Sequence, residues 1–510
     1  MSRINKSIKN IKYGFISQIL MLIVSFVSRM VFINTLGIKI LGLNGVFTNI
    51  ISIISLAELG IGTAIIYTLY EPLNNKDYQK VNQLMNIFKR IYIGISILII
   101  IIGSIVQIFL SKIISNIDSI ENIYLIFWLF VINSSLTYLL SYKRTILIAD
   151  QKKYIDTLYQ TFFFFILNFS QIILLFTTKS FVIFLILKSI SIVLENYFIN
   201  VRINKEYNFV YISKNSEESP RLSVNEKKSL KKNIGAMFLH KVGGVLVQST
   251  DNILISKFIG LSYVGIYANY LLITNALKLV FIILYQSLSA SVGNLNINSD
   301  KKYLKKIFDL IDFGSFWISS FFAVSLFNLF NSFISIWIGD KYIFDLKIVI
   351  AIVAVFYLNC MRNSVLTFKD SLGLFWQDRY KPILEASLNL VLSIILMKYF
   401  GLIGVFWGTL ISSLLSVVWI EPFILYKYGF NMSVKCYFKN YLTRSLFTIC
   451  LSYLIWNINL SVEHTVSNEI ISFIYKCVIT VVIFNLIFVM FYFRNQHLKS
   501  IFSHMRFFRR

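Results

Sequence analysis

The chain has 510 residues, of which 57% are hydrophobic and only 14% are charged, and its formal net charge is +25. Soluble domains carry about 25% charged residues, so this composition excludes an ordinary soluble protein and indicates a multi-pass membrane protein. The basic excess does not indicate nucleic-acid binding, because Lys and Arg concentrate in short loops between apolar runs. That distribution is typical of the charge bias that orients membrane proteins.

Windows of about 20 apolar residues are long enough to cross a membrane. The sequence has fourteen, which predict an all-α polytopic fold with spans at 13–36, 44–70, 90–111, 122–142, 155–177, 180–200, 234–257, 263–290, 308–331, 347–368, 382–399, 403–425, 442–460 and 470–493. With a cytoplasmic N-terminus, the cytoplasmic segments hold 36 of the 49 Lys and Arg residues and the outer loops hold 7. This bias predicts that both termini are cytoplasmic.

A glycine pair in the first connection recurs in the second half of the chain. Gly37 and Gly42 match Gly260 and Gly265, which lie 223 positions later. Six predicted spans intervene, so the two copies share one orientation and indicate a parallel internal repeat. We therefore expect an N-terminal six-helix lobe at 1–200, a cytoplasmic linker at 201–233, a second six-helix lobe at 234–425, and two further helices with a basic cytoplasmic tail at 426–510.

Basic residues inside predicted spans are the main functional signal. A charge at membrane depth costs about 2.5–3.5 kcal/mol on insertion scales, so it normally faces a partner or a polar cavity. The clear acids at similar depth are Glu58, Glu195 and Asp251. They are fewer than the basic residues, which predicts a cavity of positive potential and an anionic cargo. The candidate cargo-binding residues are Arg29, Lys188, Lys241, Lys278 and Arg362.

Polar residues that share a helix face add further candidates for the cavity. In the span 234–257, His240, Lys241, Gln248 and Asp251 fall within a sector of roughly 100°. Polar residues expected to line the cavity are Gln18, Ser25 and Gln248. Glu58, Asp251 and Glu195 are expected either to carry coupling ions or protons or to neutralise nearby cations. His240 is a candidate proton site, with a hydrogen-bonded packing role as the alternative.

A purely structural role is the alternative. Charges inside a membrane can pair to fix helix packing, and lysines near span ends can extend to the headgroups. Lys188 and Lys241 lie close enough to span ends for this second role.

Other chemistry lacks its motifs. The sequence has no Walker A, HExxH or GxSxG pattern, and its four cysteines show no CxxC spacing. We therefore expect a transporter with neither a metal nor an organic cofactor, and not an enzyme.

Four sequence blocks resemble bacterial polysaccharide-biosynthesis flippases. They are Ala57–Leu73 (AELGIGTAIIYTLYEPL), Ser141–Tyr154 (SYKRTILIADQKKY), Thr250–Ser256 (TDNILIS) and Trp337–Gly339 (WIG). Over essentially its full length the chain resembles Wzx-type repeat-unit flippases of the multidrug/oligosaccharidyl-lipid/polysaccharide (MOP) superfamily.

The resemblance implies fourteen helices, with two six-helix bundles in a V around a cationic cavity. It implies a cargo of oligosaccharide on undecaprenyl diphosphate, moved by alternating access to the outer leaflet of the bacterial cytoplasmic membrane for capsule, O-antigen or exopolysaccharide assembly. Implied partners are membrane lipids, a polysaccharide polymerase and chain-length machinery. Arg29 matches the first-helix arginine often seen in related flippases, and we expect it to contact phosphate.

Two alternatives stay open at the level of sequence. An exporter of drugs or metabolites from the same superfamily would share the fold, although cationic cargo usually needs an acid-rich site. A membrane glycan polymerase is the weaker alternative, because the outer loops are short.

Overall fold

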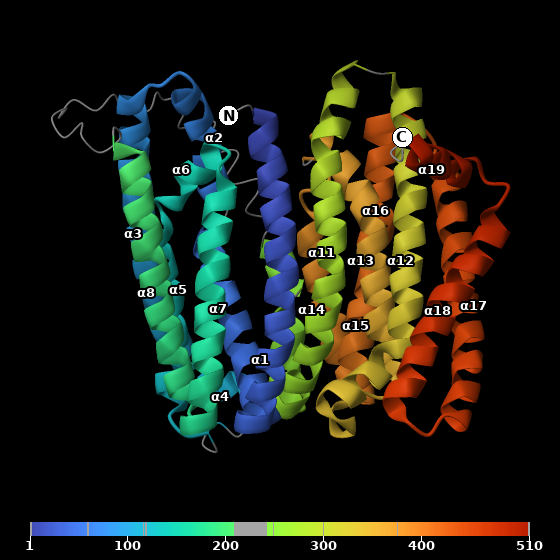
Figure 1. Cartoon of the computed structure of the whole chain (residues 1–510), viewed down its shortest axis with the longest axis horizontal. Helices are drawn as coiled ribbons and strands as arrows, with labels where there is room; N and C mark the ends of the chain where they lie inside the picture. Colours follow the sequence, from blue (N-terminus) through green and yellow to red (C-terminus); the bar gives the residue numbers. More distant parts are fainter. Residues whose placement is uncertain are drawn as a thin grey trace. The chain divides into compact units, whose positions relative to one another are not determined.

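The computed structural model describes residues 3–507 except 59–60, 116, 118–119, 209–241, 248, 299 and 375, and its described part is helical with no strand (Figure 1). Twelve helices in that part are long and apolar enough to cross a membrane. The predicted all-α membrane fold is therefore confirmed. The chain divides into two compact units, Met1–Gly265 and Ile266–Arg510.

The first unit is built from long helices joined by short connections. Its elements are α1 (Arg3–Ile54), a 3-10 turn (Ser55–Glu58), α2 (Ile61–Asn74), α3 (Tyr78–Ile108), α4 (Leu110–Ile113), α5 (Ile123–Ser141), α6 (Arg144–Ala149), α7 (Lys153–Thr178) and α8 (Phe181–Glu206). Helix α1 packs against α7, and α5 packs against α3 and α8. The short helix α6 buries Ile146 and Leu147 in an apolar cluster with residues of α2, α3, α7 and α8.

The second unit contains α11 (Leu261–Asn298, whose first turn belongs to the first unit), α12 (Lys301–Ile338), a 3-10 turn (Asp340–Tyr342), α13 (Leu346–Ser371), α14 (Lys381–Phe400), α15 (Leu402–Leu415), α16 (Val417–Ile424), a π-helical turn (Leu425–Phe430), α17 (Lys435–Thr465), α18 (Glu469–Tyr492) and α19 (Gln496–Phe507). Helices α17 and α18, which correspond to the two predicted appended spans, pack beside α12 (Figure 1).

Two predicted span boundaries need correction. The spans predicted at 13–36 and 44–70 meet within α1, which is interrupted only at Gly37, whose φ of +82° is non-helical. The second span is also not continuous, because its helix ends at Ile54 and a 3-10 turn follows. The sequence there combines Glu58 with Gly60 and Gly62, and glycine is a poor helix former. The predicted linker and the span 234–257 lie largely outside the described residues.

A ladder of buried polar contacts joins α12 to α17. Arg444 Nη1 lies 2.5 Å from Asp312 Oδ2, and Ser320 lies 2.7 Å from Thr448. Further along, Asn459 donates to Asn328 at 3.2 Å. The α12 members are eight residues apart, so each lies about 80° further around that helix than the one before. Inside a membrane such bonds specify which helices pack together, since apolar surface alone does not distinguish helix from lipid.

We predict that Arg444→Gln lowers the stability of the protein strongly. The substitution removes the cation beside Asp312, whose side chain is only 5% exposed, and leaves an unpaired buried carboxylate. Breaking a buried ion pair in this way costs about 3–5 kcal/mol. The measurement is thermal unfolding in detergent. The matched control is Lys305→Gln, which breaks a pair with the more exposed Asp309 and should cost less than about 1 kcal/mol. Equal losses of stability in the two variants would contradict a stabilising role of the Arg444–Asp312 ion pair.

Candidate functional site

Arg29, on α1, is a cation without a neutralising partner in the described part of the chain. Its Nη1 atom is buried and makes no hydrogen bond with any described residue. Ser25, one turn earlier, donates its hydroxyl to Met21 O of its own helix at 2.7 Å. A buried guanidinium nitrogen without an acceptor is unfavourable, so this position favours binding of an anion.

Lys188 and Lys278 also lie within spans, on α8 and α11. The Lys188 ammonium lies 5.8 Å from the centre of the Phe130 ring, a cation–π contact that stabilises the charge without neutralising it. Lys278 is half-buried, and no described residue forms a hydrogen bond or ion pair with it. Each unit therefore holds at least one intramembrane cation that no described acid neutralises.

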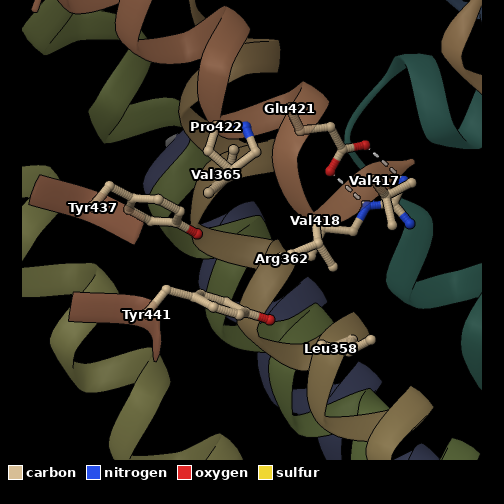
Figure 2. Close-up of a pocket in the computed structure, with 9 residues that line it drawn as sticks. All are labelled: Leu358, Arg362, Val365, Val417, Val418, Glu421, Pro422, Tyr437 and Tyr441. Atoms are coloured by element: carbon tan, nitrogen blue, oxygen red, sulfur yellow. Dashed lines mark hydrogen bonds and ion pairs between the residues drawn. The ribbon is translucent and has the colours of Figure 1, made fainter. Parts of the chain in front are cut away.

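Arg362, on α13, has a different environment. Its Nε and Nη2 atoms donate to the two carboxylate oxygens of Glu421, at 2.7 and 2.8 Å (Figure 2). Lys381 donates to the same carboxylate at 2.6 Å, and Glu385 lies 3.5 Å from Lys381 and 4.0 Å from Arg362. Two cations and two acids therefore form a neutral cluster that joins α13, α14 and α16.

A small pocket lies beside this cluster. Figure 2 shows Tyr437 and Tyr441 of α17 pointing toward the helices that carry Arg362 and Glu421. Its other walls are apolar and come from α13 and α16: Leu358, Val365, Val417, Val418 and Pro422. Because the Arg362 fork already holds a carboxylate, this region fits a structural clamp better than an open anion site.

The predicted acids are distributed among several environments. Glu195 accepts a hydrogen bond from Arg144 at 2.7 Å, and the same guanidinium lies 3.1 Å from Asp156. Glu58 lies 3.5 Å from the Tyr138 hydroxyl, which donates to it. Asp251 is buried. Glu195 therefore has a structural partner, and its predicted part in ion coupling stays a prediction.

Few contacts can be described for the remaining predicted site residues. Gln18 is exposed, while His240, Lys241 and Gln248 lie outside the described residues. No group of three or more metal-ligating side chains occurs among the residues that the structure describes.

The connection between α6 and α7 carries a second polar network near the predicted cytoplasmic end. The Tyr207 hydroxyl donates to Asp150 at 2.7 Å, and Lys152 pairs with both Asp150 and Glu206 at 2.7 Å. Burial and the hydrogen bond to Asp150 raise the pKa of Tyr207, so this hydroxyl stays protonated and keeps donating at any physiological pH. The network fixes the end of α8 rather than forming a cargo site.

Sequence reasoning missed the partners of two charged residues. Arg144 and Glu421 organise the clamps around Glu195 and Arg362, yet neither was predicted as an intramembrane charge of interest. A signal for Glu421 was present, because Glu421-Pro422 falls inside the predicted span 403–425. Arg144 stands just after a predicted span end, so it looked like an ordinary loop residue.

The fold and its charged interior define a multi-pass α-helical membrane protein of the architecture found in MurJ and MATE transporters. The lipid II flippase MurJ, in its inward closed conformation, superposes with a TM-score of 0.66 at 16% sequence identity, covering 94% of this chain and 98% of MurJ. An inward-facing multidrug resistance MATE transporter of the MOP superfamily gives 0.57 at 13% identity, covering 81% of this chain and 96% of the transporter.

A MOP superfamily transporter from Pyrococcus furiosus, described as having a binding pocket of reversed polarity, gives 0.54 at 13% identity, covering 84% and 97%. No protein-family model matches the sequence, and no curated protein matches it. At these identities the likenesses show the fold, and they confirm the architecture that the sequence predicted.

We predict that Glu421→Gln destabilises the protein more than Glu385→Gln does. Glu421 is fully buried and accepts three charge-assisted hydrogen bonds, so its neutralisation leaves Arg362 and Lys381 with only the more distant Glu385. The expected loss is about 3–5 kcal/mol for Glu421→Gln. Glu385→Gln should lose about 1 kcal/mol, because its contacts are longer. Thermal unfolding of both variants checks the order, and the reverse order would contradict the clamp.

Proposed function

We propose that the chain is a flippase that moves oligosaccharide repeat units linked to undecaprenyl diphosphate from the inner to the outer leaflet of the bacterial cytoplasmic membrane. The main support for this proposal is the presence of intramembrane cations, Arg29 above all, that no described acid neutralises. A transporter of cations would instead need acids at these depths. The cargo would serve capsule, O-antigen or exopolysaccharide assembly, with both termini of the chain in the cytoplasm.

The chemistry of a diphosphate matches these cations. Arginine presents a planar fork of N–H donors that binds phosphate oxygens in pairs, whereas lysine supplies a point charge. An anion bound to Arg29 would give its buried Nη1 the acceptor that it lacks among the described residues. Lys278 and Lys188 would add positive potential, with Lys241 as a further candidate. Arg362 would take part only if its carboxylate partner released it.

The likeness to MurJ supports a flippase without establishing the cargo. MurJ is described as a flippase for lipid II, and it shares its fold over nearly the whole of this chain. We infer the same manner of action, alternating access, with the N-terminal lobe 1–200, the linker 201–233, the lobe 234–425 and the helices of 426–510 as its parts. Glu58, Asp251, Glu195 and His240 are the groups proposed to couple ions or protons.

A drug or metabolite exporter is the second candidate, because MATE transporters share the fold. The observation in its favour is the presence of Glu58 and Asp251 in helical segments of the first unit. The unneutralised basic residues count against it, since a cationic drug would be repelled by them.

We predict that Arg29→Gln and Lys278→Gln each lower the rate of flipping at least ten-fold while the stability of the protein is unchanged or raised. Removing an unpaired charge from the membrane relieves its desolvation penalty, so a loss of transport could not be ascribed to unfolding. The measurement is flipping of a fluorescent undecaprenyl-diphosphate oligosaccharide in proteoliposomes, together with thermal unfolding. The control is Lys398→Gln, which removes an exposed lysine.

Two outcomes would count against the proposal. Transport by both variants at the wild-type rate would reduce these cations to packing roles. An absence of wild-type flipping under any imposed ion gradient or membrane potential would favour the exporter.

A further inference from the structure

Arg379, in the connection between α13 and α14, lies against two exposed aromatic rings. Its guanidinium carbon is 4.1 Å from the centre of the Trp376 ring and 4.5 Å from the centre of the Tyr380 ring. Trp376 is 64% exposed and Tyr380 is 65% exposed. Arg379 Nη1 donates to Trp376 O at 2.8 Å, and no described acid pairs with the guanidinium. The rings and the carbonyl therefore hold this cation in place and stabilise its charge without neutralising it.

Lys427, in the π-helical turn after α16, repeats this arrangement. Its ammonium lies 5.4 Å from the centre of the Phe423 ring and 5.2 Å from the centre of the Tyr428 ring. All three side chains are exposed, and no described acid pairs with the ammonium. We call the two groups together the basic aromatic patch, which consists of Trp376, Arg379, Tyr380, Phe423, Lys427 and Tyr428.

The two segments that carry the patch are packed against each other. Gly429 of the turn lies on Leu374 of the connection, whose Cδ1 would be 3.6 Å from a Cβ atom at that glycine. Lys381, the residue directly after Tyr380, donates to Glu421 at 2.6 Å, and Glu421 lies two residues before Phe423. The two halves of the patch are therefore joined by an apolar contact and by a buried ion pair.

The connection is itself held by a buried ion pair. Lys369, at the end of α13, pairs with Asp378, and their side chains are only 2% and 0% exposed. Asp378 directly precedes Arg379 in the chain. The exposed cation and its two rings therefore extend from a fixed backbone. A group that is fixed in advance loses less conformational freedom when it binds a ligand.

The patch lies where the membrane meets water. The connection joins the candidate spans Leu346–Ser371 and Lys381–Phe400, and Lys427 lies in the last turn of the span Leu402–Phe430. Trp and Tyr are enriched at this depth, because their rings are amphipathic. The charge bias predicts that this end faces the cytoplasm, where anionic lipids make the membrane surface negative and attract basic residues.

Phosphate is the group that matches these two cations. Arg379 Nη2 has no described acceptor, and a guanidinium forms strong charge-assisted hydrogen bonds with phosphate oxygens. A sugar fits the patch less well, because one face of each of the Trp376 and Tyr380 rings is already taken by Arg379.

We propose that the basic aromatic patch is a binding site for the headgroups of anionic phospholipids. The aromatic rings lie in the headgroup layer, and Arg379 and Lys427 contact the phosphates. The inference does not depend on the proposed cargo, because it concerns the lipid that surrounds the protein rather than the molecule that the protein moves.

The test places a reporter within the patch. Gln377, which is exposed, is replaced by Cys and labelled with an environment-sensitive dye, in a full-length chain whose native cysteines Cys360, Cys436, Cys450 and Cys477 are replaced. The protein in detergent is titrated with phosphatidylglycerol and, separately, with zwitterionic phosphatidylcholine. The dye should report phosphatidylglycerol at a concentration at least ten-fold lower than phosphatidylcholine.

The double variant Arg379→Gln/Lys427→Gln should need at least ten-fold more phosphatidylglycerol for half-saturation, because both phosphate contacts are removed. The matched control is Lys347→Gln/Lys398→Gln, which removes two exposed lysines from the opposite ends of α13 and α14 and should leave the value within two-fold of the wild type.

A second variant separates the rings from the charges. Trp376→Leu/Tyr380→Leu keeps both cations and should weaken binding of phosphatidylglycerol about three-fold or more, because Arg379 loses the rings that position it. A purely electrostatic surface would not respond to this change. Size-exclusion profiles verify folding, and Arg379→Gln/Lys427→Gln gives the decision if the leucine variant does not fold.

The site is overturned if phosphatidylglycerol and phosphatidylcholine half-saturate the dye at the same concentration, or if the control variant loses as much affinity as Arg379→Gln/Lys427→Gln. It is also overturned if the patch residues are needed for binding of undecaprenyl-diphosphate oligosaccharide but not of phosphatidylglycerol, because the patch would then serve the cargo. None of these results bears on whether the wild type flips its cargo, so the proposed function succeeds or fails separately.

Discussion

The desolvation of charge inside a membrane constrains every other feature of this protein. An intramembrane cation is stabilised by an acid, an aromatic face or a ligand, unless it lies near a span end and extends to the headgroups. Arg362, and Arg144 just beyond a predicted span, are neutralised by carboxylates of their own units. Lys188 has an aromatic ring, and Arg29 has a buried nitrogen with no described acceptor. This difference separates charges that hold helices together from charges that no described acid neutralises.

Buried ion pairs fix the packing of helices inside each unit. Arg444 with Asp312 joins α17 to α12, and Lys381 with Glu421 joins α14 to α16. Breaking a buried ion pair costs about 3–5 kcal/mol, so these contacts keep the helices of a unit together.

Much of the fold could be predicted from the sequence, because span length and charge bias follow directly from membrane thickness and membrane orientation. The spacing of the glycine repeat gave no sign that Gly42 and Gly265 would touch. The break after Ile54 was missed because hydropathy averages over a window and does not register a local change of helix type.

The candidate site was harder to predict, because pairing depends on which helices become neighbours. Arg29 and Arg362 look alike in sequence, since each is a single arginine in an apolar span. Only the packing of α13 against α16 shows that Arg362 meets Glu421. Depth in a span therefore identifies a charge of interest, but its partner must come from tertiary structure.

The central claim is that the cargo is an anionic lipid-linked sugar, and it is tested most directly by comparing two cargoes on the wild-type protein. One is a fluorescent oligosaccharide on undecaprenyl diphosphate, and the other carries the same oligosaccharide and polyprenyl chain joined without phosphate. In proteoliposomes the account predicts protein-dependent flipping of the diphosphate-linked cargo and at least ten-fold slower flipping of the neutral one. Equal flipping of both would contradict a cargo site built around cations.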